Sequence, residues 1–133
     1  MSTTLLDYDF AVLRAVPHVH LGAFVNVGVV LHVRTAELLV LRVLTDVDTL
    51  RARVPGVDAE LLARYLSACE AIGAGDASAG PVALAPSSER FHWLTAPRSD
   101  VIQSSAVHEG MTADPRREVE GLYRQYVLGE GRG

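Results

Sequence analysis

The sequence predicts a single α+β domain, with a mostly antiparallel sheet and helices packed on one face of it. Three observations support this fold class. Apolar residues recur at every second position in the first third of the chain, the spacing becomes helical after residue 46, and a helix opened by proline follows residue 114. The 133 residues suffice for one domain with its own core, and no repeat or linker divides them.

The N-terminal part predicts three strands in an antiparallel meander. Residues 8–16 are aliphatic and aromatic and end at Pro17. Residues 24–33 hold an unbroken apolar face at their odd positions, which is typical of a strand with one face in the core. After a four-residue polar turn, residues 38–43 are apolar on both faces and predict a buried strand.

Aspartates mark the expected starts of three helices. Asp46 can cap a short helix that runs through Val54, and Asp58 can cap a second one. The pair Asp114-Pro115 combines a capping side chain with proline at the first helical position. The second helix is expected to bury a stripe at helical spacing, formed by Leu62, Tyr65, Leu66, Cys69 and Ile72.

Between and after these helices the pattern is weaker. Residues 73–81 are rich in glycine and alanine and predict a flexible loop, and residues 82–84 predict a short edge strand. Residues 91–95 and 101–105 predict a strand pair joined around a proline. The tail, residues 129–133, is expected to be disordered.

Composition indicates a soluble cytoplasmic protein. The net charge of −4 disfavours nucleic acid as a partner, because such binders need excess positive charge. No apolar run could span a membrane, no signal peptide is visible, and the single Cys69 cannot form an internal disulfide. All twelve basic residues are arginine, so no lysine nucleophile is available.

The segment around residues 90–103 carries the most chemistry. On a strand, Arg90 and His92 would share one face, the following turn supplies Arg98 and Ser99, and the next strand brings Gln103. Arginine with serine and glutamine donors is a common way to grip phosphate or carboxylate. The alternative is a structural hairpin whose polar side chains tie down loop backbone.

Asn26 is a polar residue in the middle of the most apolar strand, where burial without a partner is costly. Two interpretations are open. Asn26 either closes a β-bulge together with Gly28 or faces the same polar surface as Arg90 and His92.

No metal, cofactor or nucleophile signature is complete. His18 and His20 could begin a zinc site with His32 and His92, but no cysteine pair supports it, and we predict no metal. The Gly-x-Ser-x-Gly pattern and the phosphate-binding glycine loop are absent, so we predict no cofactor and no catalytic residue.

Several blocks carry a family resemblance: Tyr8 to Arg14, Val16-Pro17, Phe24 to Leu31, Arg90 to Ser99, Val101 to Gln103, and Val107-His108. Together they resemble the bacterial domain-of-unknown-function family 3037 over nearly the whole chain. The resemblance implies a small stand-alone bacterial protein and transfers no catalytic residue. Relatives often have an arginine and a glutamate just before the Asn-Val-Gly strand, near Leu21 and Ala23, where this chain has neither.

We therefore expect a non-enzymatic binding or accessory module that recognises a partner protein or a small anionic ligand. A homodimer and a HipA-type kinase partner are expected with it. The alternative is a hydrolase or nuclease-like enzyme acting on a phosphoester, with His92 or His108 as general base and arginines stabilising charge. The predicted binding residues are Arg14, Asn26, Arg90, His92, Arg98, Ser99, Gln103 and His108.

Overall fold

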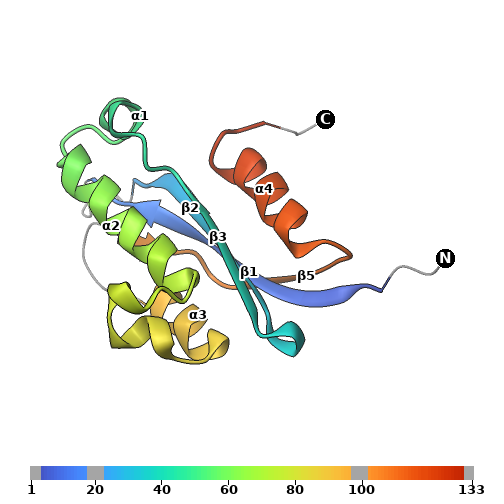
Figure 1. Cartoon of the computed structure of the whole chain (residues 1–133). Helices are drawn as coiled ribbons and strands as arrows, with labels where there is room; N and C mark the ends of the chain where they lie inside the picture. Colours follow the sequence, from blue (N-terminus) through green and yellow to red (C-terminus); the bar gives the residue numbers. More distant parts are fainter. Residues whose placement is uncertain (1–3, 18–22, 97–101, 131–133) are drawn as a thin grey trace.

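The computed structural model describes residues 4–17, 23–96 and 102–130. Within these ranges it confirms a single α+β domain. Its main elements (Figure 1) are, in chain order, β1 (Leu6–Ala15), β2 (Val25–Val33), β3 (Leu38–Val43), α1 (Val47–Arg53), α2 (Ala59–Gly73), α3 (Ser87–Thr95), β4 (Ile102–Ser104), β5 (His108–Thr112) and α4 (Pro115–Tyr126).

The described strands form one antiparallel sheet in the order β3-β2-β1-β4. The fifth strand, β5, lies on the same side of β1 as β4, because β1 pairs with β5 through its first half and with β4 through its second half. Strand β3 is therefore one outer edge of the sheet, and the short strands β4 and β5 share the other. The predicted meander of the first three strands is confirmed.

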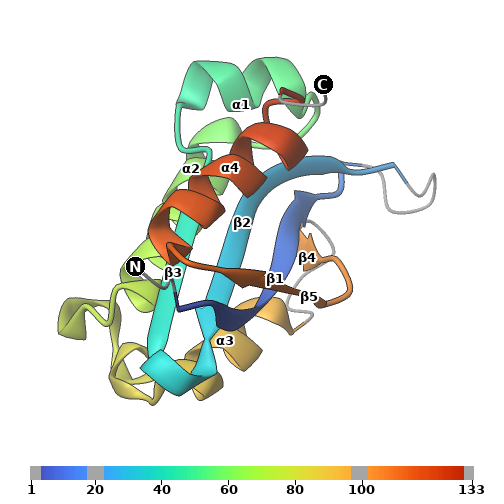
Figure 2. The ribbon, with the colours of Figure 1, turned by 90° about the vertical axis from the view of Figure 1, so that its right-hand side faces the viewer.

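Helices cover both faces of the sheet, which corrects the expectation that they lie on one face. Helix α4 lies on one side, and α2 and α3 lie on the other, while α1 packs against α2 at one end of the sheet (Figures 1 and 2). Phe10 contacts Tyr126 of α4, whereas His32 stacks on Phe91 of α3. The physical reason lies in β2, where every residue from Val27 to Val33 is buried. Because residues on both faces of β2 are apolar and buried, helices have to pack on both faces of the sheet.

The three predicted helix starts are confirmed by their caps. The carboxylates of Asp46, Asp58 and Asp114 accept hydrogen bonds from backbone N–H groups three residues on, at 2.9, 3.1 and 3.2 Å. Such caps satisfy donors that the first helical turn leaves free. In α2 the predicted stripe is buried at Leu62, Leu66, Cys69 and Ile72 and half-buried at Tyr65.

Residues 91–95 form the end of helix α3, so the predicted strand there is wrong. The buried residues of this segment are Ser87, Phe91 and Leu94, a spacing of four and three that belongs to a helix. The predicted strand at residues 82–84 is also wrong, because Pro81–Leu84 is a 3-10 turn. Ala77–Ala79 forms another such turn within the predicted loop.

The expected pairing of residues 101–105 with residues 91–95 is replaced by pairing with β1, through Ile102 to Ser104. Strand β5 was not predicted. Its sequence, His-Glu-Gly-Met-Thr, has little β-branched character, and four of its five residues are not buried. Backbone pairing with β1 holds it in place. None of the helices in the described ranges is long and apolar enough to cross a membrane.

Candidate functional site

Arg90 is tied to main-chain carbonyls. Its guanidinium donates to the carbonyl oxygen of Ala85 at 2.9 Å, and to those of Ile72 and Gly73 at 3.2 and 2.7 Å. The last two belong to the C-terminal turn of α2, where carbonyls lack helical partners. A cation there also complements the negative end of the helix. The contacts of Arg90 therefore close the end of α2.

His92 does not join Arg90 on a common face, as a strand would have required. Residues two apart on a helix point in different directions, and His92 lies exposed on α3. Arg98 and Ser99 lie outside the described residues. The predicted surface built on Arg90 and His92 is thus not formed by a hairpin.

Three other predicted residues do come together, in one row across the sheet. Arg14 of β1 is paired with Asn26 of β2 on one side and with Gln103 of β4 on the other. Because residues directly opposite share a face, the three side chains project toward the α4 side. We call Arg14, Asn26 and Gln103 the Arg14 row. Asn26 confirms the side, because its Nδ2 donates to the carbonyl oxygen of Tyr126 at 3.0 Å.

A β-bulge places Asn26 in this row. Gly28 pairs with Leu13 and Asn26 pairs with Arg14, so Val27 is the additional residue on β2. The bulge reverses the alternation and turns Asn26 to the same face as Arg14. The first interpretation of Asn26 is therefore confirmed, because it adjoins a bulge together with Gly28. The second is wrong, because the polar row that Asn26 faces contains Arg14 and not Arg90 or His92.

The Arg14 row contains two buried polar atoms without a hydrogen-bond partner in the described part of the chain. They are Nε of Arg14 and Oδ1 of Asn26. The guanidinium of Arg14 also lies over the ring of Phe24, with its carbon 4.1 Å from the ring centroid. An unsatisfied buried polar group costs on the order of 1–3 kcal/mol, so this arrangement favours a ligand that supplies the missing partners.

Arg14 differs from the other half-buried arginines of the described ranges. Arg42 forms an ion pair with Glu120 at 3.2 Å, Arg53 donates to the Val127 carbonyl oxygen at 2.6 Å, and Arg90 binds three carbonyls. Arg14 alone among these four makes no hydrogen bond or ion pair within the described residues. Its guanidinium instead makes a cation–π contact with the ring of Phe24.

His108 lies on the same face of the sheet, further along β1. It pairs with Phe10, and the two rings are 5.3 Å apart. Phe10 and Arg14 are four residues apart on one strand, roughly 13 Å. No described residue forms a hydrogen bond that would orient His92 or His108. A general base is normally held by such a bond.

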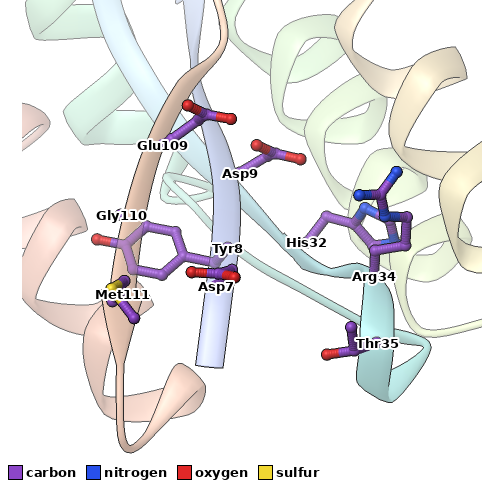
Figure 3. A pocket seen from close by; sticks show the side chains of 9 residues that line it. All are labelled: Asp7, Tyr8, Asp9, His32, Arg34, Thr35, Glu109, Gly110 and Met111. Carbon is purple, nitrogen blue, oxygen red and sulfur yellow. The ribbon is translucent and has the colours of Figure 1, made fainter. Parts of the chain in front are cut away.

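A second candidate is an acidic pocket that the sequence analysis missed, with a volume of about 440 Å³. It opens on the opposite face of the sheet from the Arg14 row. Glu109, Asp9 and His32 stand in one row across β5, β1 and β2, and Asp7 and Arg34 line the same pocket. Figure 3 shows the Asp9 carboxylate directed toward the side where His32 and Arg34 lie.

His32 forms the inner wall of the acidic pocket. It is buried, its Nε2 lies 2.9 Å from the hydroxyl oxygen of Ser87, and its ring stacks on Phe91 with the planes 22° apart. Burial lowers the pKa of His32, and the Asp9 carboxylate partly opposes that shift. The imidazole is therefore neutral at pH 7, and Arg34 is the pocket's one cationic side chain.

The acidic pocket suits positive charge, because three carboxylates and one arginine line it. Within residues 4–17, 23–96 and 102–130, however, no group of three or more His, Cys, Asp or Glu side chains is placed to hold a metal ion. Side chains two residues apart on a strand share a face, so Asp7 and Asp9 could have been assigned to one face of β1 from the sequence. Glu109 could have been added to that face only if strand β5 had been predicted.

Comparison with known proteins gives a family and no activity. A family model described as a protein of unknown function, DUF3037, matches residues 10–127. No curated protein and no solved structure matches the chain. The match spans most of the chain, including the Arg14 row and all four α-helices. The resemblance found in the sequence blocks is thereby confirmed, and the chain belongs to the DUF3037 family.

Proposed function

We propose that this protein is a non-enzymatic binding module that takes up an anionic group at the Arg14 row. The group is a carboxylate or phosphate, carried by a small ligand or by an acidic segment of a partner protein. The observation that carries the proposal is a half-buried guanidinium that has no counter-charge from residues 4–17, 23–96 and 102–130, next to the exposed amide of Gln103. Charge-assisted hydrogen bonds to such an anion are stronger than those between neutral groups.

The two unsatisfied atoms of the Arg14 row also indicate which chemical groups the ligand should carry beside its anionic group. The Nε of Arg14 needs an acceptor, whereas the Oδ1 of Asn26 needs a donor. A carboxylate or phosphate with a neighbouring hydroxyl or N–H would satisfy both atoms. Phe24, which is 49% exposed, lies against one face of the guanidinium, and the N–H groups of Arg14 point outward in the guanidinium plane.

Two features support binding over catalysis. His92 lies on α3 and His108 on β5, and neither is oriented by a hydrogen bond from a described residue. The Arg14 row itself holds no carboxylate, thiol or imidazole that could act as nucleophile or base. We include in the proposal a cytoplasmic location, a partner protein such as a HipA-type kinase, and self-association as a homodimer.

The test is a thermal-unfolding screen with a defined panel of anions. Phosphate, acetate, lactate, L-glutamate and an acidic hexapeptide would each be added to the wild-type chain, to Arg14→Gln and to Arg64→Gln. Arg64 is exposed on α2 and is the matched control. We expect at least one anion to raise the melting temperature of the wild type and of Arg64→Gln, with no rise for Arg14→Gln. Equal responses of the two variants would overturn the proposal.

A further inference from the structure

Strand β3 is an open edge of the sheet in the described part of the chain, and it is opposite to the edge that β4 and β5 form. Leu44 donates its N–H to the carbonyl oxygen of Val27. In an antiparallel ladder hydrogen-bonded pairs alternate, so Arg42, Val40 and Leu38 also bond to β2. The N–H and C=O groups of Leu39 and Leu41 therefore point outward, away from the sheet.

The carbonyl of Val43 supports this assignment, because it accepts a hydrogen bond from the Arg42 side chain at 3.2 Å. Like the backbone groups of Leu39 and Leu41, this carbonyl points away from β2. Residues 38–41 contain no proline, no charged residue and no bulge. Those are the usual means by which proteins prevent an edge strand from pairing with another chain.

A groove of about 380 Å³ runs along this edge. Its floor is the outer side of β3 and one wall comes from the end of α2, while α4 contributes an arginine from the other face. The residues that line it are 37–41, Glu70, Gly73, Ala74, Arg90 and Arg116.

The groove has room for one strand beside β3 but not for the same edge of a second copy. Helix α2 packs against β3 more than against any other strand. If two copies paired through their β3 strands, they would be related by a two-fold axis normal to the sheet. Both α2 helices would then lie on the same face, above two β3 strands only about 4.8 Å apart. Packed helices need about 8–10 Å between their axes, so the two walls would collide.

We propose that an extended segment of a partner protein adds to β3 as an antiparallel strand in this groove. Its backbone exchanges hydrogen bonds with Leu39 and Leu41, and its side chains alternate between the two walls. Side chains opposite Leu39 and Leu41 face α2, where the Leu41 side chain already fills the space beside Gly73, so Ala74 leaves room only for a small residue and Glu70 favours a basic one. Side chains opposite Val40 face α4, where Arg116 favours an acidic one.

The charges of this groove are available for recognition. Arg116 and Glu70 are exposed, and within the described residues neither side chain makes a hydrogen bond or an ion pair. Arg90, in contrast, already binds carbonyls and serves as part of the wall. The Arg116→Glu variant is therefore expected to change the preferred residue at the α4-facing positions from acidic to basic.

The first experiment pans a phage-displayed random dodecapeptide library against the full chain, and then titrates the best synthetic peptide. Ala74→Trp fills the groove, and Ala68→Trp, an exposed position of α2 outside the groove, is its matched control. We expect Ala74→Trp to weaken peptide binding at least tenfold and Ala68→Trp to leave it unchanged. Failure to enrich any peptide, or equal loss in both variants, would overturn the proposal.

Hydrogen exchange and backbone methylation give a second, independent readout on the wild-type chain. In the free protein the amides of Leu39 and Leu41 should exchange fast and that of Val40 slowly, and the peptide should slow the first two. N-methylation of alternate peptide amides should abolish binding in one register and be tolerated in the other. Equal effects in both registers, or a dimer that Ala74→Trp abolishes, would refute peptide addition.

Discussion

The guanidinium carbon of Arg14 lies 4.1 Å above the centroid of the Phe24 ring, on the sheet face covered by α4. A cation over an aromatic face is attracted by the ring quadrupole. The contact fixes the guanidinium beside Gln103 and Asn26, in the absence of any ion pair from the described residues. Phe24 thus acts as the platform of the proposed anion site.

Replacing Phe24 should weaken anion binding with a small effect on the fold. Phe24 is half-exposed, and a cation–π contact at such a site contributes about 0.5–1 kcal/mol. We expect Phe24→Ala to lower the free energy of unfolding in urea by no more than about 1 kcal/mol. Phe24→Tyr is the control, because it keeps an aromatic face. Phe24→Ala binding the responding anion as tightly as Phe24→Tyr would contradict the role of the ring.

Stability should decline on the acidic side of neutrality because of His32. Burial lowers the pKa of His32 in the folded protein, so the unfolded state binds more protons between the folded and unfolded pKa values. The stability that neutral His32 contributes is fully present above its pKa in the unfolded state, about 6.5. It is lost as the pH falls toward the lower pKa of the folded state. Urea unfolding from pH 7.5 to pH 5 measures it.

The control for this pH dependence uses two variants. His32→Gln removes the titration while an amide can still bond to Ser87, and His92→Gln removes an exposed histidine. The pH slope should shrink in His32→Gln and persist in His92→Gln. A slope that is unchanged in His32→Gln would assign the acid sensitivity to other groups.

Two glycines should respond to alanine in opposite directions. A Cβ on Gly28 would stand 2.8 Å from Cγ1 of Val43 and 3.2 Å from the carbonyl oxygen of Arg42. Overpacking of this kind costs about 1–3 kcal/mol. Gly121 in α4 has nothing within 4 Å, so Gly121→Ala should stabilise by roughly 0.5–1 kcal/mol through helix propensity. Chemical denaturation of both variants tests the pair; stabilisation by Gly28→Ala would show that β3 can move away from the bulge.

Alanine substitutions of Arg90 and of His92 should differ in their effect on the free energy of unfolding. Arg90→Ala removes the hydrogen bonds to Ala85, Ile72 and Gly73 at the end of α2, and we expect a loss of about 2–3 kcal/mol. His92→Ala changes an exposed side chain and should stay within about 0.5 kcal/mol. Thermal and urea unfolding measure both. Near-wild-type stability of Arg90→Ala, with loss of anion binding, would restore Arg90 as a ligand-binding residue.

Local signals in the sequence were sufficient where a structure depends on neighbours along the chain. The alternation in β2 and the capping aspartates of α1, α2 and α4 were readable because strand faces and helix caps repeat over two to four residues. The segment at residues 91–95 was misread, because five residues do not distinguish alternation from helical spacing. The buried trio of Ser87, Phe91 and Leu94 only becomes visible over the whole helix.

The sequence predicted which residues form the candidate site, but only in part which of them lie together. Arg14, Asn26 and Gln103 were all named from the sequence, yet their assembly in one row depends on the bulge at Val27 and on the pairing of β4 with β1. The acidic pocket was missed, because Glu109 meets Asp9 only through β5.

The sequence by itself determined the α+β class, the first three strands, the starts of three helices and the family. Tertiary structure alone decided that Arg90 would bind carbonyls of α2, while Arg14 would make no hydrogen bond or ion pair with the described residues. The reason is physical: caps and periodicity are local, whereas the neighbours of Arg90 and Arg14 come from segments 17 to 89 residues away, which only the folded chain brings into contact.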